Sequence, residues 1–390
     1  MTELTRRQLL ERATLGGAAL SLPALLAACG GSSSSGSAST TTGSTGGSQK
    51  LASTLRFSNW TLYIDVDEKT KRHPTLDEFK KKYGVSTEYV EDINSNSQYF
   101  GKIQGPLSRG QSIDRDIIVM TDNSRFPSLL IRKGWVEKLD KSAIPNISNL
   151  VPALRHPNWD PNREYSLPWQ SGITGIGYNE KLTDPVLTID DLLENPKLKG
   201  RITMLDEMAD SMTAVMLSNG DDPTKVTNAS FDKAYDRIKK AVDSGQIRQF
   251  TGNDYTGPLA KGDLLAALSW SGDIVQLQAD NPHLKWNIPE AGTDIWTDNM
   301  LIPTGGNVFT ASTYMNFVYD PKVAAQIAAY VNYICPVLGA KAVLAKTDPK
   351  LAANPLIFPT EAMLKKTYVF DSEALNNPKY LEKWQSLVGA

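Results

Sequence analysis

Short apolar segments alternate with amphipathic segments along most of this chain, and the alternation occurs twice. Residues 55–60 are predicted to form a strand, and residues 75–83 have helical spacing, with Gly84 placed to end the helix. The apolar run at 116–120 is typical of a strand buried on both faces of a parallel sheet. The pattern restarts after the proline-rich stretch 145–161. Strands that alternate with helices predict an α/β fold.

The second half of the chain resembles the first in its pattern. Residues 173–178, 201–205 and 265–270 are predicted strands, and a helix is predicted to begin after Thr188 as its N-cap. Two α/β halves of similar size predict two lobes with a ligand cleft between them. Ligands of open α/β sheets bind beyond the carboxyl ends of the strands, so a site is expected there.

The first fifty residues have the pattern of an export signal and a tether. An arginine pair precedes an apolar run at 13–28, which is too short to span a membrane. After Cys29, residues 30–48 are all Gly, Ser, Thr or Ala, a composition that forms flexible coil. The sequence Leu-Ala-Ala-Cys that ends at Cys29 resembles the lipobox of bacterial lipoproteins. The resemblance implies that the chain is cut before Cys29 and that its thiol carries a lipid anchor.

Composition narrows the possible functions. The 390 residues carry a formal net charge of −2 at pH 7, without the basic character typical of nucleic-acid-binding domains. Three histidines and two cysteines offer little material for a metal site, and no nucleophile-elbow or phosphate-loop motif is present. Cys335 follows an apolar helical segment at 323–334 and is predicted to be a buried packing thiol. The sequence therefore predicts no catalytic residue, no cofactor and no metal.

Aromatic and acidic residues recur just after predicted strands. The blocks are Asn59-Trp60-Thr61-Leu62-Tyr63, Thr121-Asp122-Asn123, Asp206-Glu207-Met208-Ala209-Asp210, Trp270-Ser271-Gly272-Asp273 and Trp296-Thr297-Asp298. An indole ring attracts a cation through its quadrupole, and a carboxylate neutralises that cation. Such pairs along one cleft suit an elongated polycation. Tryptophans that pack in a core and acids that begin a helix would give the same pattern, and the residues alone leave both interpretations open.

The order and spacing of these blocks resemble the spermidine/putrescine-binding proteins of ABC polyamine importers, which have the type 2 periplasmic-binding-protein fold. The similarity runs from about Leu55 to Pro303 and includes further blocks at 116–119, 165–169 and 176–179. It implies a monomeric, two-lobed solute-binding protein that is not an enzyme. Such a protein is extracytoplasmic, held at the cell membrane (periplasm or outer face) through its lipid anchor, and delivers a polyamine to an ABC permease.

The resemblance also implies the residues that contact the ligand. The implied set is an aromatic clamp of Trp60, Tyr63, Trp270 and Trp296, a hydroxyl contact from Thr121, amine-binding carboxylates at Glu207, Asp210 and Asp298, and further contacts from Thr61, Asp122 and Trp169. Leu62 stands where the family often has an acid, and Asn123 stands where it commonly has an aromatic residue. A later tyrosine of the family is predicted to be replaced around Cys335. These departures leave open the ligand's length and its number of amines.

The two-lobe interpretation also predicts domain boundaries. They are 1–28 for the signal peptide, 29–50 for the lipidated tether, 51–172 with 297–336 for lobe 1, 173–296 for lobe 2, and 337–390 for a C-terminal helical segment that packs on the lobes. The chain is expected to cross between the lobes near Gly172 and near Thr297. These two crossings would act as a hinge when the lobes close on a ligand.

Two alternatives remain open from the sequence. A protein of the same fold could bind another solute, either a sugar or another organic cation, although a sugar site would favour Asn, Gln and Arg over three acids. A surface hydrolase could use two of the acids as a catalytic pair. A turnover assay on polymer substrates would distinguish the hydrolase.

Overall fold

The computed structural model of the protein describes residues 50–389, and Leu51–Ala390 is assigned to one compact unit. The predicted signal peptide, Cys29 and all but the last residue of the predicted tether lie outside the described residues. Among the described helices, none has both the length and the apolar character that a membrane span requires.

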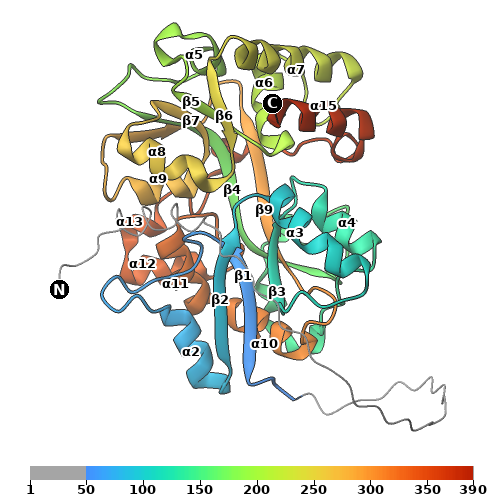
Figure 1. The fold of residues 1–390 in the computed structure, drawn as a ribbon. Helices are drawn as coiled ribbons and strands as arrows, with labels where there is room; N and C mark the ends of the chain where they lie inside the picture. Colours follow the sequence, from blue (N-terminus) through green and yellow to red (C-terminus); the bar gives the residue numbers. More distant parts are fainter. Residues whose placement is uncertain (1–49, 390) are drawn as a thin grey trace, which may run out of the picture. The chain divides into compact units, whose positions relative to one another are not determined.

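The strands of the described chain form a sheet in which two groups of parallel strands are joined by two antiparallel ones (Figure 1). Their bounds are β1 (Thr54–Trp60), β2 (Ser86–Ile93), β3 (Ile117–Thr121), β4 (Ser166–Asn179), β5 (Ile202–Leu205), β6 (Ile247–Thr251), β7 (Ala266–Trp270), β8 (Leu284–Asn287), β9 (Thr293–Leu301) and β10 (Thr367–Tyr368). The order is β2-β1-β3-β9-β4-β7-β5-β6, with β8 paired to β4 and β10 paired to β9. The predicted α/β fold is confirmed, as a mixed sheet rather than a purely parallel one.

Strand β4 is longer than the strand predicted from the sequence, because it begins at Ser166 instead of Ile173. Its first half pairs with β9 as far as Ile173, and its second half pairs with β7 from Thr174 onward. Residues 298–301 of strand β9 pair with β3 along one edge, and residues 295–301 pair with β4 along the other. The two strands therefore connect the β1–β3 group with the β5–β7 group, as Figure 1 shows.

A third segment is tied to this connection at Ser171. The Ser171 N–H donates to the Ile334 carbonyl at 2.9 Å, and the Ile334 N–H donates back to the Ser171 carbonyl at 2.8 Å. The Ser171 hydroxyl also lies 2.8 Å from the Thr297 hydroxyl of β9. Ser171 thus joins three stretches of backbone that are far apart in the sequence.

Helices flank both strand groups. Their bounds are α2 (Pro74–Tyr83), α3 (Asn96–Ser108), α4 (Phe126–Arg132), α5 (Ile189–Glu194), α6 (Met208–Ser218), α7 (Asn228–Asp243), α8 (Thr256–Lys261), α9 (Ser271–Leu277), α10 (Val308–Val318), α11 (Pro321–Val331), α12 (Ala340–Thr347), α13 (Pro349–Ala352), α14 (Glu361–Leu364) and α15 (Pro378–Val388). In Figure 1, α2–α4 and α10–α13 lie around β1–β3, and α5–α9 and α15 lie around β5–β7. The predicted caps are confirmed: Gly84 ends α2 with a φ of 72°, and Thr188 begins α5 in a capping box with Asp191.

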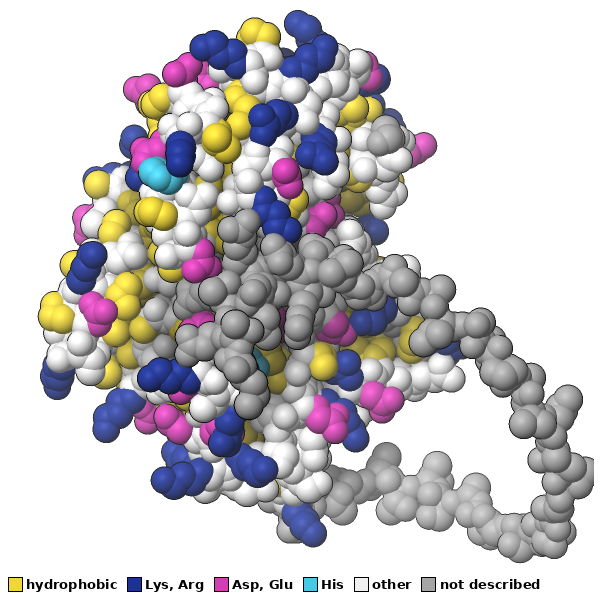
Figure 2. All heavy atoms as spheres, turned by 60° about the vertical axis from the view of Figure 1, so that its left-hand side comes forward, with side chains coloured by type: hydrophobic (Ala, Val, Ile, Leu, Met, Phe, Trp, Pro, Cys, Tyr) yellow, Lys and Arg dark blue, Asp and Glu magenta, His cyan; other side chains and the backbone are white. Residues whose placement is uncertain are grey.

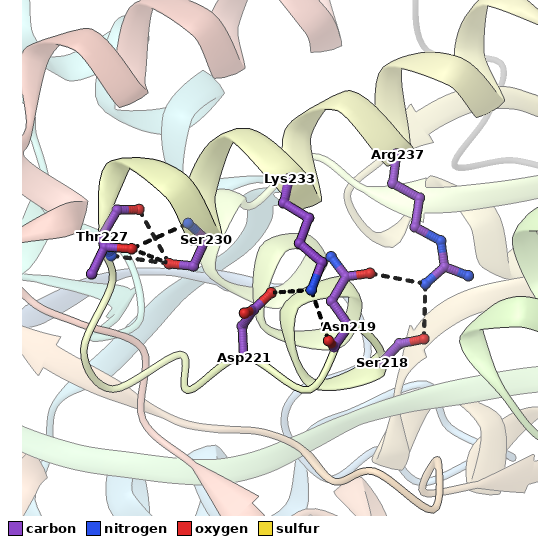
Figure 3. Close-up of polar contacts among 7 residues, drawn as sticks. All are labelled: Ser218, Asn219, Asp221, Thr227, Ser230, Lys233 and Arg237. Carbon is purple, nitrogen blue, oxygen red and sulfur yellow. Dashed lines mark hydrogen bonds and ion pairs between the residues drawn. The ribbon is translucent and has the colours of Figure 1, made fainter.

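The end of α6 is fixed against α7 (Figure 3). Lys233 donates to the Asn219 carbonyl at 2.9 Å and to Asp221 at 3.2 Å. Arg237 donates to the Ser218 hydroxyl at 3.0 Å and to the Asn219 side-chain oxygen at 3.2 Å. These contacts position α6, whose opposite end carries two of the predicted carboxylates.

The C-terminal segment packs against several of these elements. Strand β10 pairs with β9, and Tyr380 of α15 stacks on Phe231 of α7 with ring centroids 3.9 Å apart. The Trp384 indole N–H donates to the Asp206 carbonyl at 2.8 Å. The end of the chain thus supports both α7 and the loop in which α6 begins.

Charged side chains of both signs are interspersed on the face shown in Figure 2. Exposed ion pairs, such as Lys197 with Asp184 and Lys239 with Asp243, add little to stability.

Candidate functional site

Most of the predicted ligand-contacting residues come together in one pocket. Its lining residues are Trp60, Thr61, Tyr63, Asn96, Thr121, Asn123, Glu207, Asp210, Asn253, Trp270, Asp273, Trp296, Asp298 and Tyr333. Apart from Tyr333, which follows α11, they end or follow the parallel strands β1, β2, β3, β5, β6 and β7, or lie on β9. The pocket is thus at the carboxyl ends of the parallel strands, where ligands of α/β sheets bind.

Aromatic rings form a continuous wall of this pocket. Trp60 and Trp270 meet edge to face with ring centroids 5.8 Å apart, and Trp270 meets Trp296 in the same way at 6.0 Å. Tyr333 continues the wall, 5.7 Å from Trp296 and 5.0 Å from Tyr63. The wall offers both apolar surface for methylene groups and ring faces for cations.

Two glycines make room for these rings. A Cβ atom on Gly172 would lie 2.3 Å from the Trp296 ring, and one on Gly272 would lie 2.2 Å from the Tyr333 ring. The Trp296 indole N–H also donates to the Thr174 hydroxyl at 3.1 Å. The two glycines explain locally why the backbone of β4 and the start of α9 come so close to the aromatic wall.

Asp298 is held by two hydroxyl groups. It is 3% exposed, and its oxygens accept hydrogen bonds from Tyr63 and Thr121, each at 2.7 Å. Burial raises the pKa of Asp298 to about 7, although the two hydroxyl donors act in the opposite direction. The carboxylate is therefore costly to keep charged until a cation reaches it.

The other pocket carboxylates also lack a cationic partner. Glu207 accepts from the Asn96 backbone N–H at 2.9 Å, and Asp210 accepts from the Thr174 hydroxyl. Asp273 accepts from the hydroxyl of Tyr333 at 2.7 Å. Burial raises the pKa of Glu207 to about 8 and that of Asp210 to about 7, and burial also raises the pKa of Asp273.

No lysine, arginine or histidine lines this pocket in the described structure. None of the four pocket carboxylates takes part in an ion pair among residues 50–389. A buried carboxylate without a partner is unfavourable, whereas a bound cation supplies that partner. A cation bound beside these side chains would favour their charged forms over the protonated forms that burial favours.

Two predicted site residues do not line the pocket. The Asp122 carboxylate accepts from the Thr297 backbone N–H at 2.8 Å and lines a separate cavity, so its own side chain is directed away from the rings. Trp169 donates to the Tyr63 carbonyl at 3.1 Å and packs edge to face on Phe57, which places it behind the wall. Both residues support the site from outside.

Five lining residues were absent from the predicted set. Asn96, Asn253 and Tyr333 come from segments that gave no strand-end signal, whereas Asn123 and Asp273 occur in the blocks quoted from the sequence. Tyr333 therefore supplies a ring close to Cys335, and the replacement of a family tyrosine around Cys335 stays a prediction.

The two remaining predictions about this region concern Cys335 and metals. Cys335 is 5% exposed, as predicted for a packing thiol, and burial raises its pKa to about 12, which disfavours the reactive thiolate. Within residues 50–389, no group of three His, Cys, Asp or Glu side chains is arranged to hold a metal ion.

Comparison with known proteins identifies the family. Residues 75–359 match the family described as bacterial extracellular solute-binding protein. The chain belongs to this family. The bacterial extracellular solute-binding proteins are transport components, so the prediction of a binding protein rather than an enzyme is confirmed.

Relatives within this family cover most of the chain. It is 27% identical to the spermidine/putrescine-binding periplasmic protein of Escherichia coli (strain K12), over 87% of this chain and 88% of the relative. It is 28% identical to the putrescine-binding periplasmic protein SpuD of Pseudomonas aeruginosa (strain UCBPP-PA14), over 81% and 86%. Among solved structures, the spermidine/putrescine ABC transporter substrate-binding protein PotD of Streptococcus pneumoniae aligns with a TM-score of 0.68 and 25% identity, over 86% of this chain and 97% of that one. The predicted periplasmic-binding-protein fold is confirmed.

Proposed function

We propose that this solute-binding protein captures a polyamine in the pocket described above and delivers it to an ABC permease. One observation carries the proposal: the four carboxylates of the pocket are buried among aromatic rings without a described cationic partner. A polyamine supplies separate ammonium groups for these carboxylates and methylene groups for the rings. The names of the relatives, which refer to spermidine and putrescine, support the same ligand class.

An uncharged sugar would leave the buried carboxylates uncompensated, and an anion would be repelled by them. Another organic cation is the second candidate, because it could meet the same rings and acids. A short monocation would neutralise one of the four carboxylates and leave the others buried without a partner. The number of carboxylates in the pocket therefore favours a ligand with several amines.

Capture would proceed by closure of the two predicted lobes, 51–172 with 297–336 and 173–296. The change of partners along β4, between Ile173 and Thr174, supports the proposed boundary near Gly172. Closure removes water from the ion pairs and so strengthens them. The closed form is then what the permease would recognise.

Anchoring through a lipid on Cys29 is part of the same proposal. A chain with Cys29→Ser is expected to leave the membrane fraction and to lose incorporation of a labelled fatty acid. Membrane retention and labelling equal to those of the wild-type chain would contradict a lipid at this residue.

Isothermal titration calorimetry of residues 30–390 tests the ligand assignment, because this chain contains the compact unit and lacks the anchor. Putrescine, spermidine and spermine are titrated at two salt concentrations. One-to-one binding of at least one of them is expected, with an affinity that is retained at the higher salt because the pairs are buried. The absence of heat and of a thermal shift with all three would contradict the proposal, and organic cations with one charge would be tested next.

A further inference from the structure

A buried carboxylate outside the predicted set lies beside the pocket. Asp294 precedes Trp296 by two residues on β9 and Asp298 by four, so the three side chains share one face of the strand. It is 1% exposed. Its Oδ2 accepts from the Asn123 side chain at 2.8 Å, and its Oδ1 has no hydrogen-bond partner among the described residues.

The Asn123 amide is fixed between two carboxylates. Its Nδ2 donates to Asp294 at 2.8 Å and to Asp210 at 3.2 Å. An ionised carboxylate can only accept, so a charge on either acid turns the NH2 group of the amide toward it and the carbonyl oxygen away. The side chains of Asp210 and Asp294 thereby decide which end of the Asn123 amide is free.

The free end is a buried acceptor on a residue that lines the pocket. Asn123 lines the pocket and is 3% exposed, and its carbonyl oxygen is buried without a partner among residues 50–389. A buried acceptor without a donor is unfavourable, and a ligand N–H that reaches it removes this penalty. A methylene group at the same place would not.

We propose that Asp294 is a positioning residue for ligand choice: with Asp210, it holds the Asn123 amide so that the carbonyl oxygen accepts a hydrogen bond from an ammonium or amine N–H of the ligand. This inference rests on the proposed polyamine function. An aromatic residue in place of Asn123 would present a ring face to the ligand and would require no N–H group from it. Asn123 does require a ligand N–H group, so the pocket selects ligands that place an amine nitrogen beside Asp210.

Burial and the neighbouring Asp210 raise the pKa of Asp294 well above its usual range. The two acids therefore repel each other when both are charged, and Asn123 is the described group that donates to both. A ligand ammonium beside Asp210 would relieve this repulsion while it donates to the Asn123 oxygen. The hydrogen bond to the Asn123 oxygen and the charges of Asp210 and Asp294 thus act on the same amine of the ligand.

The test is a double-mutant cycle in residues 30–390, measured calorimetrically with putrescine and spermidine. Asp294→Asn keeps the size of the side chain, but its new NH2 group can donate to the Asn123 oxygen and occupy it. Asn123→Ala removes the acceptor itself. Each variant is expected to bind the preferred polyamine roughly ten- to a hundredfold more weakly, which is the usual value of a hydrogen bond to a charged group. The double variant is expected to bind no more weakly than Asn123→Ala alone.

Asp243→Asn is the matched control, because it removes one negative charge from an exposed residue of α7 that does not line the pocket. If Asp294 acted only through its charge, Asp294→Asn would weaken binding by the same factor whether or not Asn123 is present. Equal factors would overturn the inference, and so would an Asp294→Asn affinity within twofold of the wild type. A wild-type chain that binds no polyamine would overturn the proposed function, and this inference with it.

A crystal structure of the wild-type complex provides a second measurement that does not depend on the variants folding. A ligand nitrogen within hydrogen-bond distance of the Asn123 carbonyl oxygen is expected. A methylene group facing that oxygen would overturn the inference while leaving the polyamine function intact.

Discussion

The substitution Asp298→Asn removes one charge from the pocket while it keeps the shape of the side chain. Asp298 accepts from the hydroxyls of Tyr63 and Thr121, and both hydroxyls can also accept a hydrogen bond from the new amide. The pKa of Asp298, raised to about 7, shows that its charge is unfavourable in the empty pocket. We therefore expect the free energy of unfolding of the empty protein to stay the same or to increase.

Ligand binding should respond very differently. If the carboxylate meets a ligand ammonium, the variant leaves that ammonium buried without its partner. Loss of one partner from a buried pair costs about 3–5 kcal/mol, so the dissociation constant should rise roughly a hundred- to a few thousandfold. The measurement belongs at pH 8, where the wild-type carboxylate is mostly ionised.

Calorimetry of both proteins with spermidine and with putrescine gives the two dissociation constants, and thermal unfolding without ligand shows whether the variant is folded. Asp243→Asn, at an exposed residue of α7 that does not line the pocket, serves as the control for loss of a charge elsewhere. A folded Asp298→Asn protein with a dissociation constant within twofold of the wild-type value would refute the assignment of Asp298 to a ligand ammonium.

Three further predictions follow from the same structure. The pocket carboxylates whose pKa is raised to about 7 to 8 bind more protons in the folded than in the unfolded state, so the empty protein should lose stability as the pH rises from 5 to 8 while polyamine affinity increases. Thermal midpoints with and without ligand measure both trends. A midpoint of the empty protein that rises with pH, or a polyamine affinity that falls with pH, would contradict the burial of these acids. Gly172→Ala should displace Trp296 and weaken binding, whereas Gly101→Ala on α3, where a Cβ meets nothing within 4 Å, should not. In the empty protein, Asn123→Ala should lower the thermal midpoint, because it removes the N–H donor shared by the buried side chains of Asp210 and Asp294; an unchanged midpoint would mean that these two hydrogen bonds add nothing to stability.

The strand ends could be predicted from the sequence because each apolar run is followed directly by its aromatic or acidic residues. This local signal found Trp60, Thr121, Trp270 and their neighbours. It could not show where a side chain points after the strand ends. The Thr297 backbone N–H donates to the carboxylate of Asp122. Asp122 was therefore predicted to line the pocket from its place in the sequence, but its side chain does not line it.

Other parts of the site have no local signature. Tyr333 follows the end of α11 and reaches the pocket only because Ile334 pairs with β4. Asp294 could have been found, since it alternates with Trp296 and Asp298 along β9. The first half of β4 was missed because it contains Pro168 and leads to Gly172, and both residue types are uncommon inside strands.

The hydrogen bonds that join Ser171 of β4 to Thr297 of β9 and to Ile334 have a consequence for how such a protein can evolve. These three residues are direct chain neighbours of Gly172, Asp298 and Tyr333, so a change in these hydrogen bonds would disturb several walls of the pocket in one step. Asn123 lies on a separate segment after β3, where a single replacement changes one wall and leaves these backbone hydrogen bonds intact. Ligand choice can therefore change at such a position while the shared backbone is inherited unchanged.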